Sequence, residues 1–241
     1  MSKKLDNCWV VMPVYNEEEA GPLVIAEWMP VFRNNLSNFV FCIINDGSKD
    51  KSLQILKNIA AQNPEILLID KPNSGHGQSC LYGYKMAIDK NAEWIFQMDS
   101  DGQCDPKHFE EIVNAATQNE IVYGFRKTRE DGFKRYLISR VVTIYAFIAT
   151  KVWVRDANVP YRLMNRKSLI NFIDAVPDDF NLANIIVSVY HTKFFKIKWI
   201  NINFRNRSGG TPSVKVSAFS KHGRKLFKQL SDFKFKEEGY I

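Results

Sequence analysis

The chain has 241 residues, of which 45% are hydrophobic and 24% are charged, and its formal net charge is +7. Its longest uncharged apolar-rich run, residues 141–150, lies between Arg140 and Lys151 and falls short of the roughly 20 apolar residues of a membrane span. The first residues lack the apolar stretch of a secretory signal, and the four cysteines form no CxxC pair. We therefore expect one principal globular domain with reduced thiols, neither exported nor membrane-spanning.

Segments typical of strands and of helices alternate from Cys8 to about Phe125. Strands are predicted near residues 8–14, 39–44, 66–69, 94–98 and 121–125, and helices near residues 18–34, 50–62, 76–90 and 106–117. This alternation indicates an α/β fold with a mostly parallel central sheet flanked by helices.

Polar and acidic residues follow three of the predicted strands. The first strand ends at Tyr15 and Glu17, the second at Asp46, and the fourth at Asp99 and Asp101. Ligands of an open α/β sheet bind outside the carboxyl ends of its strands, so we expect these side chains on one rim. Two carboxylates one residue apart are able to hold Mg²⁺ or Mn²⁺, with water and substrate phosphates completing the coordination. The alternative is that the stretch after the fourth strand is only a turn, because Asp, Ser and Gly all favour turns.

Six motifs follow one another along the chain: Met12–Glu17, Asn45–Ser48, Asn73–Gly77, Met98–Gln103, Gly124–Arg126 and, more loosely, Arg207–Ser213. Their order resembles that of the family 2 inverting glycosyltransferases, which have the GT-A nucleotide-sugar-binding fold. The resemblance is closest to the branch around dolichyl-phosphate mannosyltransferase and the bacterial polyprenyl-phosphate sugar transferases. It implies a GT-A catalytic domain over residues 1–215. It also implies sugar transfer from a UDP- or GDP-linked donor to a polyprenyl-phosphate or lipid-linked glycan acceptor.

The same resemblance implies which residues bind the donor. Asp99, Asp101 and Gln103 match the family's metal site, where Mg²⁺ or Mn²⁺ acts as a Lewis acid on the pyrophosphate. The positions that match donor contacts are Pro13, Tyr15, Glu17, Asp46, Gly77, Met98, Asp99, Ser100, Asp101, Gln103, Arg126 and Arg207. Structural alternatives remain, in which Tyr15 closes the core and Glu17 occupies the first turn of a helix.

Asp156 is the predicted catalytic carboxylate, and Arg162 is grouped with it, because residues 155–164 resemble a segment of the polyprenyl-phosphate transferases. Toward a sugar hydroxyl, Asp156 would be a general base. A lipid phosphate is already anionic at neutral pH, so there the carboxylate need only orient groups. The competing base is the pair Asp178 and Asp179, whose structural alternative is an acidic helix cap.

Three other functions stay open. Transfer to a sugar hydroxyl in polysaccharide or lipopolysaccharide assembly would be favoured if Asp178 or Asp179 proved essential. Val214 weakens the lipid-phosphate interpretation, because the polyprenyl-phosphate branch often has lysine at that place. A sugar nucleotidyltransferase would show a Gly-x-Gly-Thr-Arg-like loop after the first strand, which residues 13–17 do not match. A catalytically inactive scaffold is opposed by the intact acidic positions and by Arg126.

Basic residues gather at the end of the chain. Residues 191–241 contain 12 Lys or Arg against 3 Asp or Glu, which gives +9, and the rest of the chain carries −2 of the total of +7. Within residues 216–241, basic and apolar residues interleave as in an amphipathic helix, namely Lys221, Arg224, Lys225, Leu226, Phe227, Lys228, Leu230, Phe233 and Phe235. This tail predicts a peripheral protein on the cytoplasmic face of a membrane. The alternative is packing on the body or on a partner subunit, so a homo-oligomer stays open. No nucleic-acid-binding signature accompanies the tail, and we expect no nucleic acid partner.

Overall fold

The computed structural model describes residues 4–129, 133–176, 180, 183–209 and 229–231. Its strands are β1 (Cys8–Val14), β2 (Phe39–Asp46), β3 (Ile66–Lys71), β4 (Trp94–Met98), β5 (Ile121–Arg129), β6 (Tyr161–Asn165) and β7 (Lys198–Phe204). Its helices are α1 (Ala20–Asn35), α2 (Ser52–Ala60), α3 (His76–Asp89), the 3-10 turn η1 (Pro106–His108), α4 (Phe109–Ala116), α5 (Phe133–Thr150), α6 (Arg166–Ala175) and α7 (Ala183–Phe194). Every strand and helix expected between residues 8 and 125 is present, with ends displaced by a few residues.

The described strands form one seven-stranded sheet in the order β3-β2-β1-β4-β6-β5-β7. β1 pairs in parallel with β2 and β4, β2 with β3, and β5 with β7. β6 is the exception, because it lies antiparallel to both β4 and β5. The prediction of a mostly parallel sheet is therefore confirmed.

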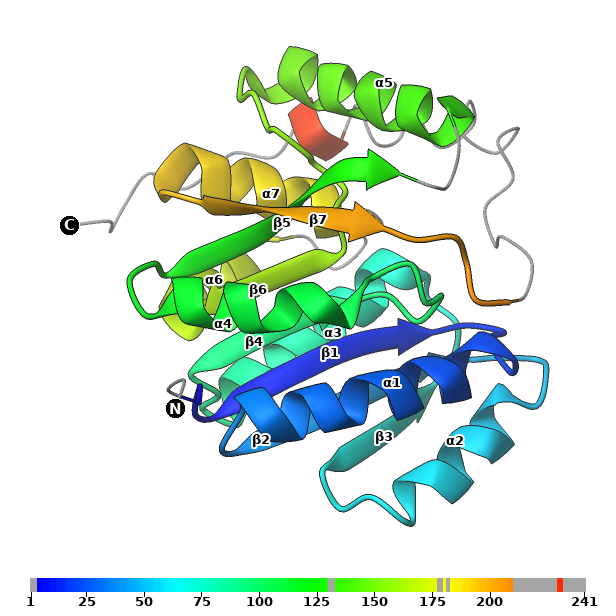
Figure 1. Ribbon diagram of the computed structural model, residues 1–241. Helices are drawn as coiled ribbons and strands as arrows, with labels where there is room; N and C mark the ends of the chain where they lie inside the picture. The colour runs from blue at the N-terminus through cyan, green and yellow to red at the C-terminus, as the bar shows by residue number, and fades with distance from the viewer. Residues whose placement is uncertain (1–3, 130–132, 177–179, 181–182, 210–228, 232–241) are drawn as a thin grey trace.

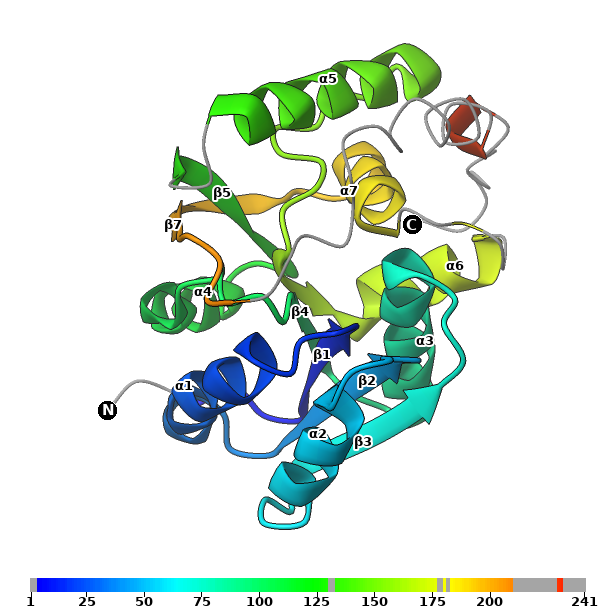
Figure 2. The same ribbon diagram turned by 90° about the vertical axis from the view of Figure 1, so that its right-hand side faces the viewer.

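Helices cover both faces of this sheet (Figures 1 and 2). α1 contacts α2 and α4 on one face, and α3 contacts α6 and α7 on the other. β1 is buried along its whole length, as expected for a parallel strand between two helical layers. The helix α5 lies beyond β5 and α7, at the outer end of the molecule.

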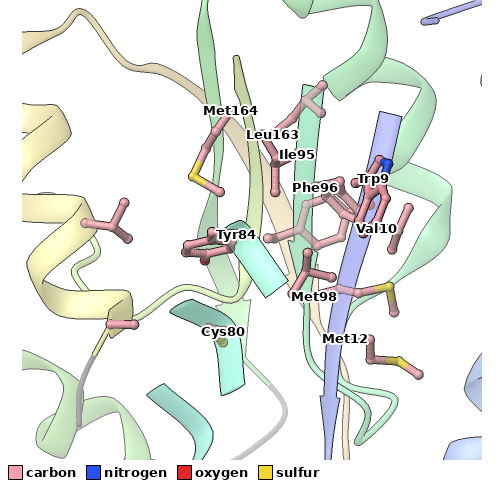
Figure 3. Packing of buried hydrophobic residues seen from close by; sticks show 14 of the residues in the cluster. Trp9, Val10, Met12, Cys80, Tyr84, Ile95, Phe96, Met98, Leu163 and Met164 are labelled. Atoms are coloured by element: carbon pink, nitrogen blue, oxygen red, sulfur yellow. The ribbon is translucent and has the colours of Figure 1, made fainter. Parts of the chain in front are cut away.

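Aromatic side chains fill the core between α1 and the sheet. Trp28 is fully buried and packs against Phe32, Phe96, Phe109 and Tyr161, with ring centroids 5.1 to 5.8 Å apart. On the opposite face, residues of α3 such as Cys80 and Tyr84 pack beside the strands (Figure 3). All four cysteines are buried free thiols.

The end of the chain is only partly described. Of the predicted tail 216–241, the structure describes residues 229–231, and Leu230 there is 1% exposed and belongs to the hydrophobic core. The burial of Leu230 agrees with the alternative in which the tail packs on the body, and membrane contact by the tail stays a prediction. The remaining tail residues named above lie outside the described residues. Within the described part of the chain, no helix combines the length and apolarity needed to cross a bilayer.

A buried histidine makes the stability of this fold depend on pH. The Nε2–H of His191 donates to the Ser168 carbonyl oxygen at 3.1 Å, and Nδ1 accepts from the Tyr123 hydroxyl at 2.6 Å. Burial, aided by the charge of Arg162, lowers the pKa of His191 to about 3. The folded protein therefore keeps His191 neutral at a pH where the unfolded chain, with a pKa near 6.5, is already protonated. The contribution of neutral His191 to the unfolding free energy is fully present above pH 6.5, and it decreases as the pH falls from 6.5 toward 3.

We expect the wild-type protein to lose about 2 to 3 kcal/mol more unfolding free energy between pH 7 and pH 4.5 than the variant His191→Gln. Glutamine does not titrate, so the difference isolates the histidine from the carboxylates that also titrate in this range. Urea unfolding at the two pH values measures it. Equal losses in both proteins would show that His191 does not remain neutral in the folded state.

Candidate active site

The loops after β1 and β2 are joined to each other by hydrogen bonds. The backbone N–H of Asn16 donates to Ser48 Oγ at 3.0 Å, and the N–H of Lys49 donates to Asn16 Oδ1 at 2.8 Å. The N–H of Glu17 donates to Ser52 Oγ at 2.8 Å. These bonds position the predicted rim residues Tyr15 and Glu17 beside the end of β2, as expected for neighbouring parallel strands.

Asp46 holds the loop between β3 and α3. Its carboxylate accepts from the N–H of Ser74 and of Gly75, both at 2.9 Å, and from Lys71 Nζ. The Asn73 side chain donates to the Asp46 carbonyl oxygen at 2.8 Å. Burial opposes ionisation of Asp46, but these hydrogen bonds hold its pKa below the ordinary value. In the structure Asp46 is therefore an anionic anchor for this loop, and its contact with a nucleotide stays a prediction.

The turn after β4 presents the two predicted metal carboxylates. Asp101 Oδ1 accepts from the N–H of Gln103 at 3.1 Å, which closes the turn. Gly102 has φ +78, and a Cβ atom there would overlap the side chain of Ser208. The N–H of Ser208 donates to the Asp101 carbonyl oxygen at 2.9 Å. Glycine is therefore required at position 102 by both the backbone conformation and the close approach of the chain near residue 208.

Arg207 reaches into the centre of this acidic rim. Its guanidinium pairs with Glu17 Oε1, lies 3.4 Å from Asp101 Oδ2, and donates to the Gly209 carbonyl oxygen at 2.7 Å. The side chains of Arg207 and Glu17 are 17% and 6% exposed. The guanidinium of Arg207 thus joins the loop after β1 to the turn after β4.

The segment that carries Arg207 is fixed by the neighbouring Arg205. Its guanidinium forms a two-fold ion pair with Glu27 of α1, at 2.7 Å for each bond, and donates to the carbonyl oxygens of Gly102 and Cys104. The amide of Gln103 donates to the Arg205 carbonyl oxygen at 3.1 Å. No sequence motif indicated this anchor, because Glu27 and Arg205 are distant in the chain and each is ordinary in its local context.

Two carboxyl groups of the rim are ionised at a cost. Burial raises the pKa of Glu17 to about 7 despite Arg207, and it raises the pKa of Asp99 to about 6, with the negative charge of Asp101 adding to both. Glu17 Oε2 is buried and accepts no hydrogen bond within the described part of the chain. A divalent cation at Asp99 and Asp101 would offset that cost, because it stabilises the ionised form of both carboxylates.

The protein side chains alone do not complete such a cation site. Among the residues that the structure describes, no three His, Cys, Asp or Glu side chains gather closely enough to hold a metal ion. Mg²⁺ and Mn²⁺ are commonly held by one or two carboxylates, with water and substrate phosphates as the other ligands. The rim therefore fits a cation that binds together with a phosphate-containing substrate.

His76 lies beside Asp99, which the sequence did not predict. Its Nε2 is 3.5 Å from Asp99 Oδ1, 3.4 Å from Asn184 Nδ2 and 3.6 Å from Cys80 Sγ. The ring begins α3, and Asn184 comes from α7, so a contact between distant segments creates this arrangement. The His76 side chain is 47% exposed, and Cys80 and Asp99 beside the ring raise the pKa of His76 above its ordinary value.

Arg126 and Asp156 form a buried ion pair. Arg126 Nε and Nη2 donate to the two carboxylate oxygens at 2.8 and 2.5 Å, and the side chains are only 6% and 10% exposed. The charge of Arg126 also acts on Asp99, whose pKa it lowers against the larger effect of burial. The structure therefore brings the predicted catalytic carboxylate Asp156 and the predicted donor-binding residue Arg126 together, within electrostatic range of Asp99.

Arg162 is fully buried, and its charge lowers the pKa of Asp99 against the larger effect of burial. Its guanidinium donates to five oxygens at 2.8 to 3.2 Å, those of Gln97 Oε1, Asn184 Oδ1, Asn184 O, Ala157 O and Ser188 Oγ. It also lies over the Tyr123 ring. One acceptor is the carbonyl oxygen of Ala157, which follows Asp156, and the acceptors of Asn184 and Ser188 belong to α7. Arg162 is therefore suited to position Asp156 and α7.

The other predicted site residues are distributed as follows. The buried ones are Pro13, Gly77, Met98 and Ser100. Met98 belongs to the hydrophobic core, so its side chain faces away from a ligand on the rim. Tyr15 is half-buried. The competing base pair, residues 178 and 179, lies outside the described residues.

A model of the family described as glycosyl transferase family 2 matches residues 9–177. The undecaprenyl-phosphate 4-deoxy-4-formamido-L-arabinose transferase of Photorhabdus laumondii is 26% identical over 215 residues, which cover 81% of this chain and 65% of that protein. A dolichyl-phosphate beta-glucosyltransferase of Trichomonas vaginalis is 26% identical over 175 residues, or 66% of this chain and 53% of that protein. The chain thus spans between about half and two thirds of the length of these curated relatives.

Among solved structures, glucosyl-3-phosphoglycerate synthase from Mycobacterium tuberculosis, in complex with Mn²⁺ and UDP-glucose, superposes with a TM-score of 0.65. The match covers 95% of this chain and 80% of that chain, at 16% sequence identity. At this level of identity the likeness shows a common fold.

Proposed function

Because the chain belongs to glycosyl transferase family 2 and has the GT-A fold, we propose that it moves a sugar from a nucleotide-sugar donor to a polyprenyl phosphate or another lipid-linked acceptor, with inversion. The observation that carries the proposal is the acidic rim, where Arg207 joins Glu17 to Asp101 and where Asp99 lies two positions before Asp101 in the turn after β4. Such a site suits a diphosphate accompanied by a divalent cation. The acceptor class rests on the relatives, which are named for transfer to undecaprenyl phosphate and dolichyl phosphate.

In this proposal Asp99 and Asp101, with Gln103 at the end of the turn, hold the cation. A bound Mg²⁺ or Mn²⁺ would stabilise the negative charge that develops on the departing nucleoside diphosphate. Arg207 would exchange its carboxylate partners for the diphosphate, because both kinds of partner are anionic and lie on the same rim. That exchange leaves Glu17 free to accept hydrogen bonds from hydroxyl or N–H groups of the nucleoside.

The Arg126–Asp156 pair supports a lipid phosphate as the acceptor. A carboxylate that holds both N–H groups of a guanidinium is a poor proton acceptor, because protonation would break the pair. An anionic phosphate needs no base, and Arg126 supplies a charge suited to it. We therefore assign Asp156 the task of orienting Arg126 in the reaction.

This assignment predicts how substitutions combine. Asp156→Asn and Arg126→Gln should each lower kcat/KM by about 100-fold, and the double variant should lose little more than either single one, because the two side chains act as a unit. Initial rates with a short-chain polyprenyl phosphate measure this, with Asp174→Asn, an exposed carboxylate of α6, as the control. Losses that multiply in the double variant would contradict a joint role. A far larger loss for Asp156→Asn than for Arg126→Gln would assign Asp156 as the base.

The proposed donor class is tested by thermal unfolding with UDP-, GDP-, CMP- and dTDP-sugars, each with and without Mn²⁺. A ligand that binds only the folded chain raises its melting temperature, so we expect a metal-dependent rise with one nucleotide class. Product analysis with that donor and either a lipid phosphate or a sugar acceptor then identifies the acceptor. No rise with any donor, at concentrations well above typical affinities, would count against the proposal.

A further inference from the structure

Exposed apolar side chains gather on one face of α5. Among the described residues, eight large hydrophobic side chains are exposed, and six of them lie on α5 or directly after it. The six, which we call the α5 surface, are Val141, Ile144, Tyr145, Phe147, Ile148 and Trp153, and each is 39% to 58% exposed. The positions 141, 144, 145 and 148 follow helical spacing and form one stripe. The other face of α5, with Val142, Thr143 and Ala146, is buried, so the stripe points away from the protein.

The segment that carries this stripe is basic. Residues 132–155 contain five basic residues, Lys134, Arg135, Arg140, Lys151 and Arg155, and no Asp or Glu, whereas Glu130, Asp131 and Asp156 lie directly outside this range. The α5 surface also contains two amphipathic aromatic residues, with Tyr145 within the stripe at 41% exposure and Trp153 after the helix at 58% exposure. Apolar side chains flanked by cations and by Tyr or Trp match the chemistry of an anionic bilayer surface, whose headgroups are negative and whose interface favours these rings.

The α5 surface also lies next to the Arg126–Asp156 pair. Only two residues separate Trp153 from Asp156, so their Cα atoms are at most about 11 Å apart along the chain. Between them, Arg155 stacks on the Phe125 ring at 4.0 Å, which ties this connection to β5 just before Arg126. The α5 surface and the pair are therefore joined by a short stretch of chain, which places a bilayer on α5 near the proposed acceptor site. The helix lies at the outer end of the molecule, where a planar surface is able to approach it (Figures 1 and 2).

We propose that the α5 surface docks the protein on an anionic phospholipid bilayer, with α5 lying in the plane of the interface. The position of the docked acceptor rests on the proposed function, but binding to the bilayer does not. This contact is separate from the one predicted for the tail.

The test is co-sedimentation of the full chain with vesicles of 30% phosphatidylglycerol in phosphatidylcholine, without donor or acceptor. We compare Ile148→Glu with Leu23→Glu, because Ile148 and Leu23 are 50% and 58% exposed and Leu23 lies on α1, away from the α5 surface. Both variants add one negative charge at an exposed position, so both should fold. We expect Ile148→Glu to lower the partition coefficient at least tenfold and Leu23→Glu to change it less than twofold. Raising the salt concentration should weaken wild-type binding, because the basic flank contributes by charge.

Two results would overturn the proposal. The first is equal vesicle binding by Ile148→Glu and the wild type, which would assign membrane contact to another part of the chain. The second is a wild-type dimer without vesicle affinity that Ile148→Glu converts to a monomer, which would show that a second copy covers the stripe. A water-soluble short-chain acceptor separates this question from the proposed function. Ile148→Glu should transfer sugar to this soluble acceptor as well as the wild type does. If neither the wild type nor the variants transferred sugar to it, the proposed function would be rejected, but the result of the vesicle experiment would still hold.

Discussion

Asp99→Asn should reduce sugar transfer at least about 1,000-fold while leaving the fold as stable as the wild type or more so. The loss follows if Asp99 holds the cation, because stabilisation of several kcal/mol on the departing diphosphate corresponds to such a factor. The stability follows from burial, which raises the pKa of Asp99 to about 6, so the ionised carboxylate is disfavoured in the folded chain at pH 7. The neutral amide removes that cost and keeps nearly the same volume.

Metal titration distinguishes this explanation from simple misfolding. Mn²⁺ together with the donor should raise the melting temperature of the wild type and leave that of Asp99→Asn unchanged. The matched control is Asp89→Asn, which removes an exposed carboxylate at the end of α3 and should behave as the wild type. A variant that keeps both transfer and the metal-dependent rise would remove Asp99 from the cation site.

Arg162→Ala should destabilise the fold by about 3 to 5 kcal/mol, a large part of the stability of a typical domain. The substitution leaves a cavity and removes a donor from five oxygens, including the carbonyl oxygens of the buried residues Ala157 and Asn184. Arg162→Lys should lose less stability, because it keeps the charge, but one ammonium cannot serve all five acceptors. Urea unfolding of the three proteins measures these differences.

Activity measured on the same variants tests the role of Arg162. The sequence grouped it with Asp156 as catalytic, whereas its complete burial indicates that it positions Asp156 and α7 through the Ala157 and Asn184 carbonyls. For a positioning residue, transfer by Arg162→Lys at low temperature should recover in step with the folded fraction. A variant as stable as the wild type but with no transfer at any temperature would restore the catalytic assignment.

Local sequence patterns were sufficient for the first half of the fold. The alternation of apolar runs with amphipathic segments indicated each strand and helix up to residue 125, because side-chain periodicity is a property of neighbouring residues. The prediction did not extend to α5 and the elements after it. There β6 runs antiparallel between β4 and β5, and its reversal depends on pairing between residues such as Phe96 and Leu163 that are far apart in the chain.

The acidic rim could also be predicted from the sequence, because parallel strands place their carboxyl ends at the same edge of the sheet whatever the details of packing. Tyr15, Glu17, Asp46, Asp99 and Asp101 follow directly from the ends of β1, β2 and β4. Which partners these residues take was decided by the tertiary structure. Arg207 pairs with Glu17 across 190 positions, and His76 approaches Asp99 only because α3 begins beside β4. An ion pair depends on two side chains meeting in space, and no local pattern encodes the distance between segments so far apart.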